Sequence, residues 1–271
     1  MRVTAGVLVV ALALGASACG GNAAAKKRHD AVTKYIISVD RIEAKLARPL
    51  VAISKANRDF AQSKSNPATI SRKLQLAADK VDALRRRLAA IDPPPDAAKL
   101  QPLLVELAQR EVSLARETAA LVLFQPAFSN ALRPLAVAGK ILKDALSSKA
   151  KPAVKATALD AYAAAIGGVL TQLARLQPPP VTAALYHNQR ATLEQVAASA
   201  TVLAQGLRVK HAKNLAALLH AFNAAAVANQ SLAAQNSEIQ AIHAYDLRIR
   251  TIDRLSIRVH REQVRLQRLL A

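Results

Sequence analysis

Residues 67–100 read PATISRKLQLAADKVDALRRRLAAIDPPPDAAKL, and residues 152–185 read PAVKATALDAYAAAIGGVLTQLARLQPPPVTAAL. The two stretches align without a gap at a constant offset of 85, and 11 of their 34 positions are identical. Because an alanine-rich chain produces chance matches, the prolines in register weigh more than this count. We interpret the stretches as two copies of one helix-PPP-helix module.

Each copy has the pattern of a helix that ends at a stiff corner. Its leading proline suits the first helical turn, where a missing N–H costs nothing. The apolar face consists of Ile70, Leu74, Ala77, Val81, Leu84, Leu88 and Ile91 in the first copy, and of Leu159, Tyr162, Ile166, Val169, Leu173 and Leu176 in the second. Three prolines, at 93–95 and 178–180, then stop the helix. A triproline is also a ligand for aromatic grooves, but between two amphipathic helices we favour a structural corner.

The rest of the chain also predicts helices. The first is expected at 27–64, with Pro49 inside it and a seam formed by Val32, Tyr35, Val39, Ile42, Leu46, Ile53 and Phe60. Others are expected at 97–125, 128–149, 181–208 and 211–271. Gly167 and Gly168 lie inside a predicted helix and mark either a close helix crossing or a weak point.

The expected fold is all-α, because the chain is rich in alanine and has only eight glycines and no tryptophan. We predict an antiparallel helical bundle made of the two repeated modules and a long C-terminal helix. The predicted segments are a signal peptide at 1–18, a lipidated cysteine and spacer at 19–26, a first module with a connecting helix at 27–149, and a second module with the long helix at 150–271.

The N-terminus carries an export signal. Arg2 precedes an apolar run from Val7 to Leu14, which is too short to span a bilayer core of about 30 Å. Small residues lead to Cys19, the only cysteine in the chain, so no internal disulfide can form. This pattern resembles a bacterial lipoprotein signal peptide. The alternative is an ordinary secretory peptide that is cleaved after Ala18 and leaves a free cysteine.

The resemblance implies cleavage before Cys19, a covalent lipid on its thiol and a location on the extracytoplasmic face of the cell membrane. The whole chain is similar in style to the all-helical, triproline-jointed lipoproteins of high-GC bacteria, a resemblance that transfers no functional residues. No second apolar run of about 18 residues is evident, so we expect the part after the anchor to be soluble.

Charge indicates the kind of partner. With 38 Lys and Arg against 18 Asp and Glu, the net charge of +20 favours anionic surfaces. A basic cluster of Lys26, Lys27 and Arg28 follows the spacer and either supports the anchor or is a solvated helix start. A helical stripe of six arginines, at steps of three and four, consists of Arg250, Arg254, Arg258, Arg261, Arg265 and Arg268. We expect these to form either a surface for an anionic partner or a solvated face.

No catalytic or metal signature is present in the sequence. The histidines are His29, His187, His211, His220, His243 and His260, and none falls in a helical zinc motif or in Glu-x-x-His. There is no nucleophile elbow and no phosphate-binding glycine loop. Asp79 and Asp82 lie among basic residues and indicate a salt-bridged face. We therefore expect no catalytic residues, no metal site and no cofactor apart from the lipid on Cys19.

The expected function is that of a membrane-tethered, non-catalytic binding or structural protein of the cell envelope. Its partners are membrane lipid through Cys19 and anionic lipid, an envelope polymer or an envelope protein; nucleic acid is disfavoured by the scarcity of aromatic residues. The sequence leaves the oligomeric state open. The alternatives are a carrier of a small ligand or metal in the bundle interior and an envelope enzyme without a recognisable motif. A polar-lined cavity with converging acids or histidines would favour the carrier, whereas a filled core would favour an interaction surface.

Overall fold

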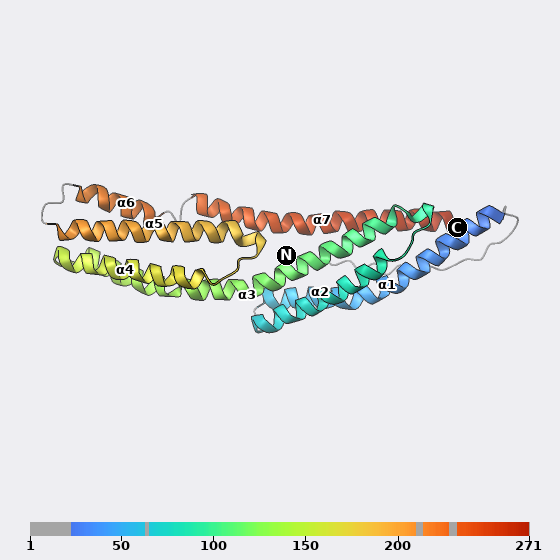
Figure 1. The fold of residues 1–271 in the computed structure, drawn as a ribbon, viewed down its shortest axis with the longest axis horizontal. Helices are drawn as coiled ribbons and strands as arrows, with labels where there is room; N and C mark the ends of the chain where they lie inside the picture. The colour runs from blue at the N-terminus through green and yellow to red at the C-terminus, as the bar shows by residue number, and fades with distance from the viewer. Residues whose placement is uncertain (1–22, 63–64, 210–213, 228–231, 271) are drawn as a thin grey trace. The chain divides into compact units, whose positions relative to one another are not determined.

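The computed structural model describes residues 23–62, 65–209, 214–227 and 232–270. This part of the chain is all-α, as predicted, and no strand occurs in it. The helices, shown in Figure 1, are α1 (Ala23–Ala61), α2 (Pro67–Ala89), α3 (Leu100–Ser147), α4 (Pro152–Leu173), α5 (Ala183–Arg208), α6 (Leu215–Val227) and α7 (Leu232–Leu270). The short 3₁₀ helices η1 (Pro95–Ala97) and η2 (Pro180–Thr182) precede α3 and α5. The signal peptide, Cys19 and His211 lie outside the described residues.

The chain folds into two compact units. Unit 1 comprises residues 1–122 and 246–271, and unit 2 comprises residues 123–245. The sequence boundary between residues 149 and 150 does not coincide with this division. The last 26 residues belong to unit 1 because the apolar face of α7, including Leu255, Val259 and Leu266, is buried in the same cluster as residues of α1 and α3.

The predicted apolar faces are the buried ones. In unit 1, Val32, Tyr35 and Val39 of α1 are buried, and α2 buries every predicted position from Ile70 to Leu88. In unit 2, the core of α4 consists of Ala156, Leu159, Ile166, Val169 and Leu173. Burial of these faces supplies the main favourable free energy, about 25 cal/mol for each Å² of apolar surface removed from water.

One prediction about α3 is wrong. Two helices were expected, at 97–125 and 128–149, but a single helix runs from Leu100 to Ser147 through Pro126 and Pro134. A proline removes the hydrogen bond to the carbonyl one turn earlier. Pro134 and Asn130, whose carbonyl loses its partner, are both exposed, so water can replace the missing bond.

The helices before the two triprolines end in corresponding ways. Gln101 is buried, and its side-chain amide donates to the backbone carbonyls of Leu88 and, at 3.0 Å, of Ile91. Its amide oxygen accepts a 2.7 Å hydrogen bond from the Tyr35 hydroxyl. In unit 2, the buried Tyr186 hydroxyl donates to the carbonyl of Leu173 at 2.5 Å. Each corner thus satisfies carbonyls that a helix end leaves without a partner.

The core of unit 2 also contains an aromatic cluster. Phe124 and Phe128 of α3 stack with ring centroids 5.3 Å apart, and the ring of Tyr186 meets Phe124 edge-on at 6.0 Å. Gly167 and Gly168 do not mark a close helix crossing, because both are exposed and an added Cβ atom would have no neighbour within 4 Å. They remain candidates for a weak point in α4.

One described helix, α4, is long and apolar enough by length and composition to cross a membrane. The sequence analysis found no such second run, since the alanines that make α4 apolar lack the bulk of a typical span. A core helix of a soluble protein passes the same test. In unit 2, α4 packs along α5, as Figure 1 shows.

Candidate ligand-binding site

Unit 1 contains a cavity of about 480 Å³ among α1, α2, α3 and α7. Most of its lining is aliphatic, and every one of the four helices contributes to it. Leu46 and Leu50 of α1 and Leu107 and Leu114 of α3 are only half-buried although they line the cavity, because the space beside them is unfilled. The volume lies in the range of sites for small molecules, about 300–1,000 Å³.

The cavity opens along one side of α7. Asp253, Ile257 and His260 line it and are themselves exposed, with 52% of Ile257 accessible to solvent. The opposite wall is closed by buried side chains of α2, including Val81 and Leu88. A molecule with an apolar body could enter beside α7 and lie against the aliphatic wall.

Glu43 of α1 is the first acid inside the cavity. Its carboxylate oxygens accept hydrogen bonds of 3.0 and 3.2 Å from the side-chain amide of Gln263 on α7. Burial raises the pKa of Glu43 to about 7, and the negative charge of Asp40 raises it further against the lowering effect of the Gln263 hydrogen bond. Glu43 can therefore exchange a proton near neutral pH.

Glu111 of α3 is the second acid. Its side chain lines the cavity and, within the described part of the chain, forms neither a hydrogen bond nor an ion pair. Burial raises the pKa of Glu111 to about 7, and the charge of Asp253 on α7 adds to the effect. Asn57 of α1 also lines the cavity, and its Oδ1 atom is buried without a donor among the described residues.

Sequence reasoning missed both acids, although a signal for them exists. Glu43 follows Val39 by four residues, and Glu111 follows Leu107 by four, so each occupies a position on the apolar face of its helix. An acid at such a position is uncommon, because burial of an unpaired carboxylate is costly. The same register on α7 places Asp253 and His260 beside the cavity.

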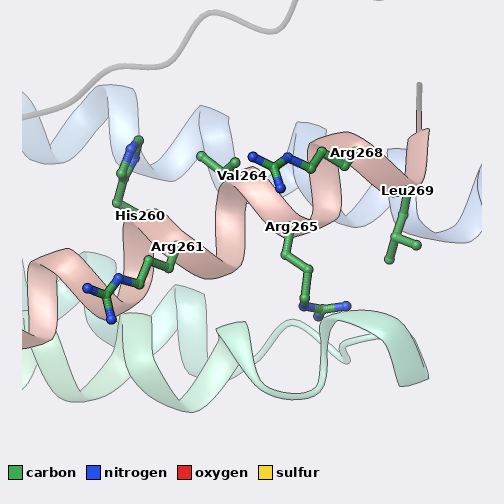
Figure 2. Close-up of a pocket in the computed structure, with 6 residues that line it drawn as sticks. All are labelled: His260, Arg261, Val264, Arg265, Arg268 and Leu269. Carbon is green, nitrogen blue, oxygen red and sulfur yellow. The ribbon is translucent and has the colours of Figure 1, made fainter.

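The arginine stripe lies on α7, also in unit 1. Five of its six members are exposed, whereas Arg265 is half-buried. The Arg265 guanidinium donates to Glu262 at 2.7 Å and to the backbone carbonyl of Asp96 at 2.6 Å. A groove of about 470 Å³ runs beside Arg261, Arg265 and Arg268, and Figure 2 shows Arg265 and Arg268 pointing in different directions. The stripe is thus a spread positive surface and not a set of converging donors.

The predicted basic cluster lies in the first turns of α1, and all three of its side chains are exposed. Arg28 forms an ion pair with Asp96, and this contact holds the pKa of the Asp96 carboxyl below its usual range. Since Arg265 binds the carbonyl of the same residue, the start of α1 and the end of α7 meet at the first triproline corner. The two predicted basic surfaces therefore lie at one end of unit 1.

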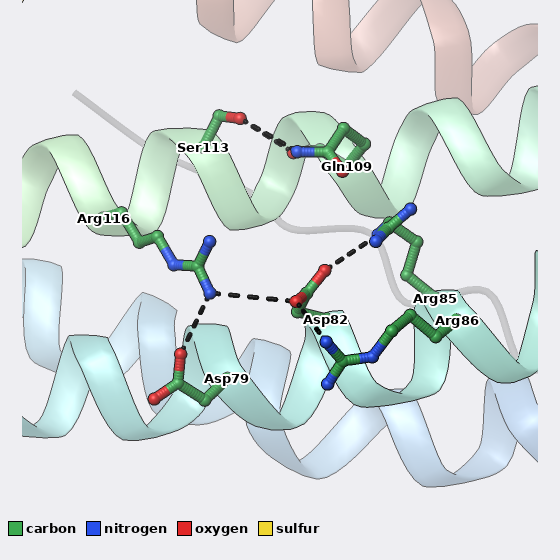
Figure 3. A network of polar contacts seen from close by, with 7 residues as sticks. All are labelled: Asp79, Asp82, Arg85, Arg86, Gln109, Ser113 and Arg116. Atoms are coloured by element: carbon green, nitrogen blue, oxygen red, sulfur yellow. Dashed lines mark hydrogen bonds and ion pairs between the residues drawn. The ribbon is translucent and has the colours of Figure 1, made fainter.

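Asp79 and Asp82 form the salt-bridged face that the sequence indicated. Figure 3 shows them on α2 beside Arg116 of α3, which binds Asp79 at 3.0 Å and Asp82 at 3.8 Å. Arg85 binds Asp82 at 2.8 Å, and this hydrogen bond lowers the pKa of the Asp82 carboxyl. These acids are occupied by structural pairs.

The described histidines do not gather. His29, His187, His220, His243 and His260 are all exposed. Within the described residues, no three His, Cys, Asp or Glu side chains lie close enough together to hold a metal ion.

Comparison with known proteins adds no functional assignment, since no family model, no curated protein and no solved structure matches the chain.

Proposed function

We propose that this protein is a non-catalytic, lipid-anchored binding protein on the extracytoplasmic face of the cell membrane, and that it carries a small ligand in the cavity of unit 1. The anchor rests on the residue pattern around Cys19. The binding function rests on the cavity, whose size, aliphatic wall and few polar groups match those of small-molecule sites. Of the functions considered from the sequence, a carrier explains an unfilled interior better than a structural protein does.

The anchor has a simple test. Labelled fatty acid should enter the wild-type protein but not the Cys19→Ala variant, because the thiol is the only possible site of thioether formation in the chain. Equal labelling of the two proteins would contradict the anchor.

The two corners support a repeated architecture. Gln101 and Tyr186 are separated by 85 residues, and so are the carbonyls of Leu88 and Leu173 to which they donate. In our proposal, residues 67–100 and 152–185 are therefore copies of one helix-PPP-helix module within an antiparallel bundle. One copy then forms part of the cavity wall, through Val81 and Leu88.

Binding can be tested with a neutral probe and a built-in reporter. The chain has no tryptophan, so an Ile257→Trp substitution places the only indole at the mouth of the cavity. Decan-1-ol, added to the mature chain with Cys19→Ser, should change its fluorescence saturably. A Val137→Trp reporter in unit 2, at a residue that is 64% exposed, serves as the control.

A second substitution makes the test specific. Ser54→Phe places an aromatic ring against the cavity and should abolish the saturable change, whereas Ser113→Phe on the exposed side of α3 should leave it intact. Equal responses from both reporters, or a response that survives Ser54→Phe, would contradict binding in the cavity.

A second function is favoured by the meeting of the two basic surfaces at the Asp96 corner. In this proposal, the exposed arginines of α7 bind anionic lipid headgroups, and they do so close to the anchored start of the chain. Arginine suits this role because its planar fork binds phosphate through two hydrogen bonds.

A further inference from the structure

The charge of the cavity is opposite to that of the protein. The chain carries 38 basic and 18 acidic side chains, yet the lining contains Glu43, Glu111 and Asp253 and neither a lysine nor an arginine among the described residues. A random sample of this composition would be basic. The exclusion of cations from the cavity therefore needs a physical reason.

The two inner acids have no counter-charge. Glu43 has only the neutral amide of Gln263, and Glu111 has no partner within the described residues. The surface acids behave differently, since Asp82, Asp96 and Glu117 all pair with arginine. An unpaired carboxylate is expensive to bury, so the fold retains two groups whose natural partner is missing.

We propose that the ligand of this cavity is an amphiphilic amine, with an aliphatic body along the leucines of α1 and α3 and an ammonium group between Glu43 and Glu111. This inference rests on the proposed carrier function. An ammonium group offers three donors and a positive charge, and each carboxylate accepts hydrogen bonds from it. The aliphatic body gains free energy from leaving water, as in other apolar pockets.

Other ligand classes fit less well. A fatty acid or a phosphorylated lipid would bring a second negative charge to an acidic interior and would be repelled. A neutral alcohol would gain the apolar contacts but would leave the carboxylates without a counter-charge. The amine is the class that satisfies both the wall and the acids.

The experiment compares decan-1-amine with decan-1-ol by means of the Ile257→Trp reporter, at pH 8 and below the concentrations at which the probes aggregate. The amine should bind about tenfold or more tightly than the alcohol, as expected for a charge-assisted hydrogen bond in a buried site. Glu111→Gln should remove this preference without weakening the binding of decan-1-ol. Glu106→Gln changes an exposed acid of the same helix and should retain the preference.

The outcomes separate the two proposals. If decan-1-ol binds and decan-1-amine shows no preference, or if both glutamine variants lose it equally, the amine inference is wrong and the carrier function stands. If neither probe binds, the carrier function is contradicted, and the inference falls with it. Glu43→Gln gives a second, independent variant should Glu111→Gln fail to fold.

The pH dependence of binding provides another readout. The charged or titratable groups around the acids are Asp40 on α1 and Asp253 and His260 on α7, whereas α2 lines the cavity with apolar residues such as Val81 and Leu88. Affinity for decan-1-amine should rise between pH 5 and pH 8 as the two glutamates ionise, because an alkylammonium stays protonated in this range. The rise should survive His260→Gln, whereas a flat profile would overturn the inference.

Discussion

At the scale of single residues, the most informative groups are Glu43 and Glu111. Each stands on the apolar face of its helix, and each has a pKa raised to about 7 by burial. In an unfolded chain the same carboxyls would titrate near 4.3. The folded protein therefore binds protons more tightly than the unfolded chain does, and its stability depends on pH.

The sign of this dependence follows from linkage. Between about pH 4.5 and pH 7 the folded state holds more protons at these two sites, so the contribution of the two carboxyls to the free energy of unfolding falls as the pH rises. Each group should account for roughly 1–3 kcal/mol over this window. Urea unfolding of wild type and of the Glu43→Gln/Glu111→Gln variant should show a flatter pH profile for the variant. Parallel profiles would contradict the burial of these acids.

At the scale of elements, the triproline corners show how helix ends are satisfied. Gln101 serves the carbonyls of Leu88 and Ile91 and holds the Tyr35 hydroxyl, while Tyr186 serves Leu173 alone. Both side chains are buried, so no water can take their place directly. The first corner therefore depends on its polar side chain more than the second does.

This difference predicts unequal costs for two substitutions. Gln101→Ala leaves two carbonyls and a hydroxyl without partners and should lower the free energy of unfolding by about 2–4 kcal/mol. Tyr186→Phe leaves one carbonyl and should cost about 1–2 kcal/mol. Gln109→Ala, at an exposed position of α3, should stay within about 0.5 kcal/mol. Chemical denaturation of the three variants decides the matter, and a larger loss for Tyr186→Phe than for Gln101→Ala would contradict the assignment.

Sequence periodicity predicted those elements whose apolar residues repeat regularly. The buried positions of α2 and α4 follow from a period of 3.6 and from the prolines at their first turns. The unbroken course of α3 could not be predicted, because the cost of Pro126 and Pro134 depends on whether water reaches the freed carbonyls.

The candidate site was predictable only in part. Periodicity places Glu43 and Glu111 on apolar faces, and this could have marked them as unusual. It does not show that four helices leave a space between them, since that depends on side-chain packing in three dimensions. The arginine stripe of α7 was visible in the sequence, but the engagement of Arg265 with Asp96 was not.

At the scale of the whole molecule, a net charge of +20 surrounds an acidic cavity. Long-range attraction to an anionic membrane and short-range affinity for a cationic head group are compatible, because the first acts over the surface and the second in a low-dielectric interior. An anchored carrier benefits from both, since the membrane is a source of amphiphilic ligands.

The surface part of this account predicts salt-sensitive membrane binding. The variant with Arg250, Arg254, Arg258 and Arg261 changed to Gln removes four exposed charges and leaves Arg265 in its structural contacts. Wild type with Cys19→Ser should co-sediment with anionic vesicles but not with neutral ones. Binding should weaken as salt shortens the Debye length from about 10 Å at 0.1 M to about 3 Å at 1 M. Equal binding by wild type and the variant would make the stripe a solvated face.

The central claim is that unit 1 holds a small molecule in its cavity, and native mass spectrometry of the full mature chain purified from its own membrane tests it most directly. Wild type and the exposed-face control Ser113→Phe should carry the same additional mass, which collisional activation releases as a nitrogen-containing amphiphile. Ser54→Phe should carry none, because its ring occupies the space that the ligand needs. Bare protein in all three spectra, or an identical adduct on Ser54→Phe, would contradict the account.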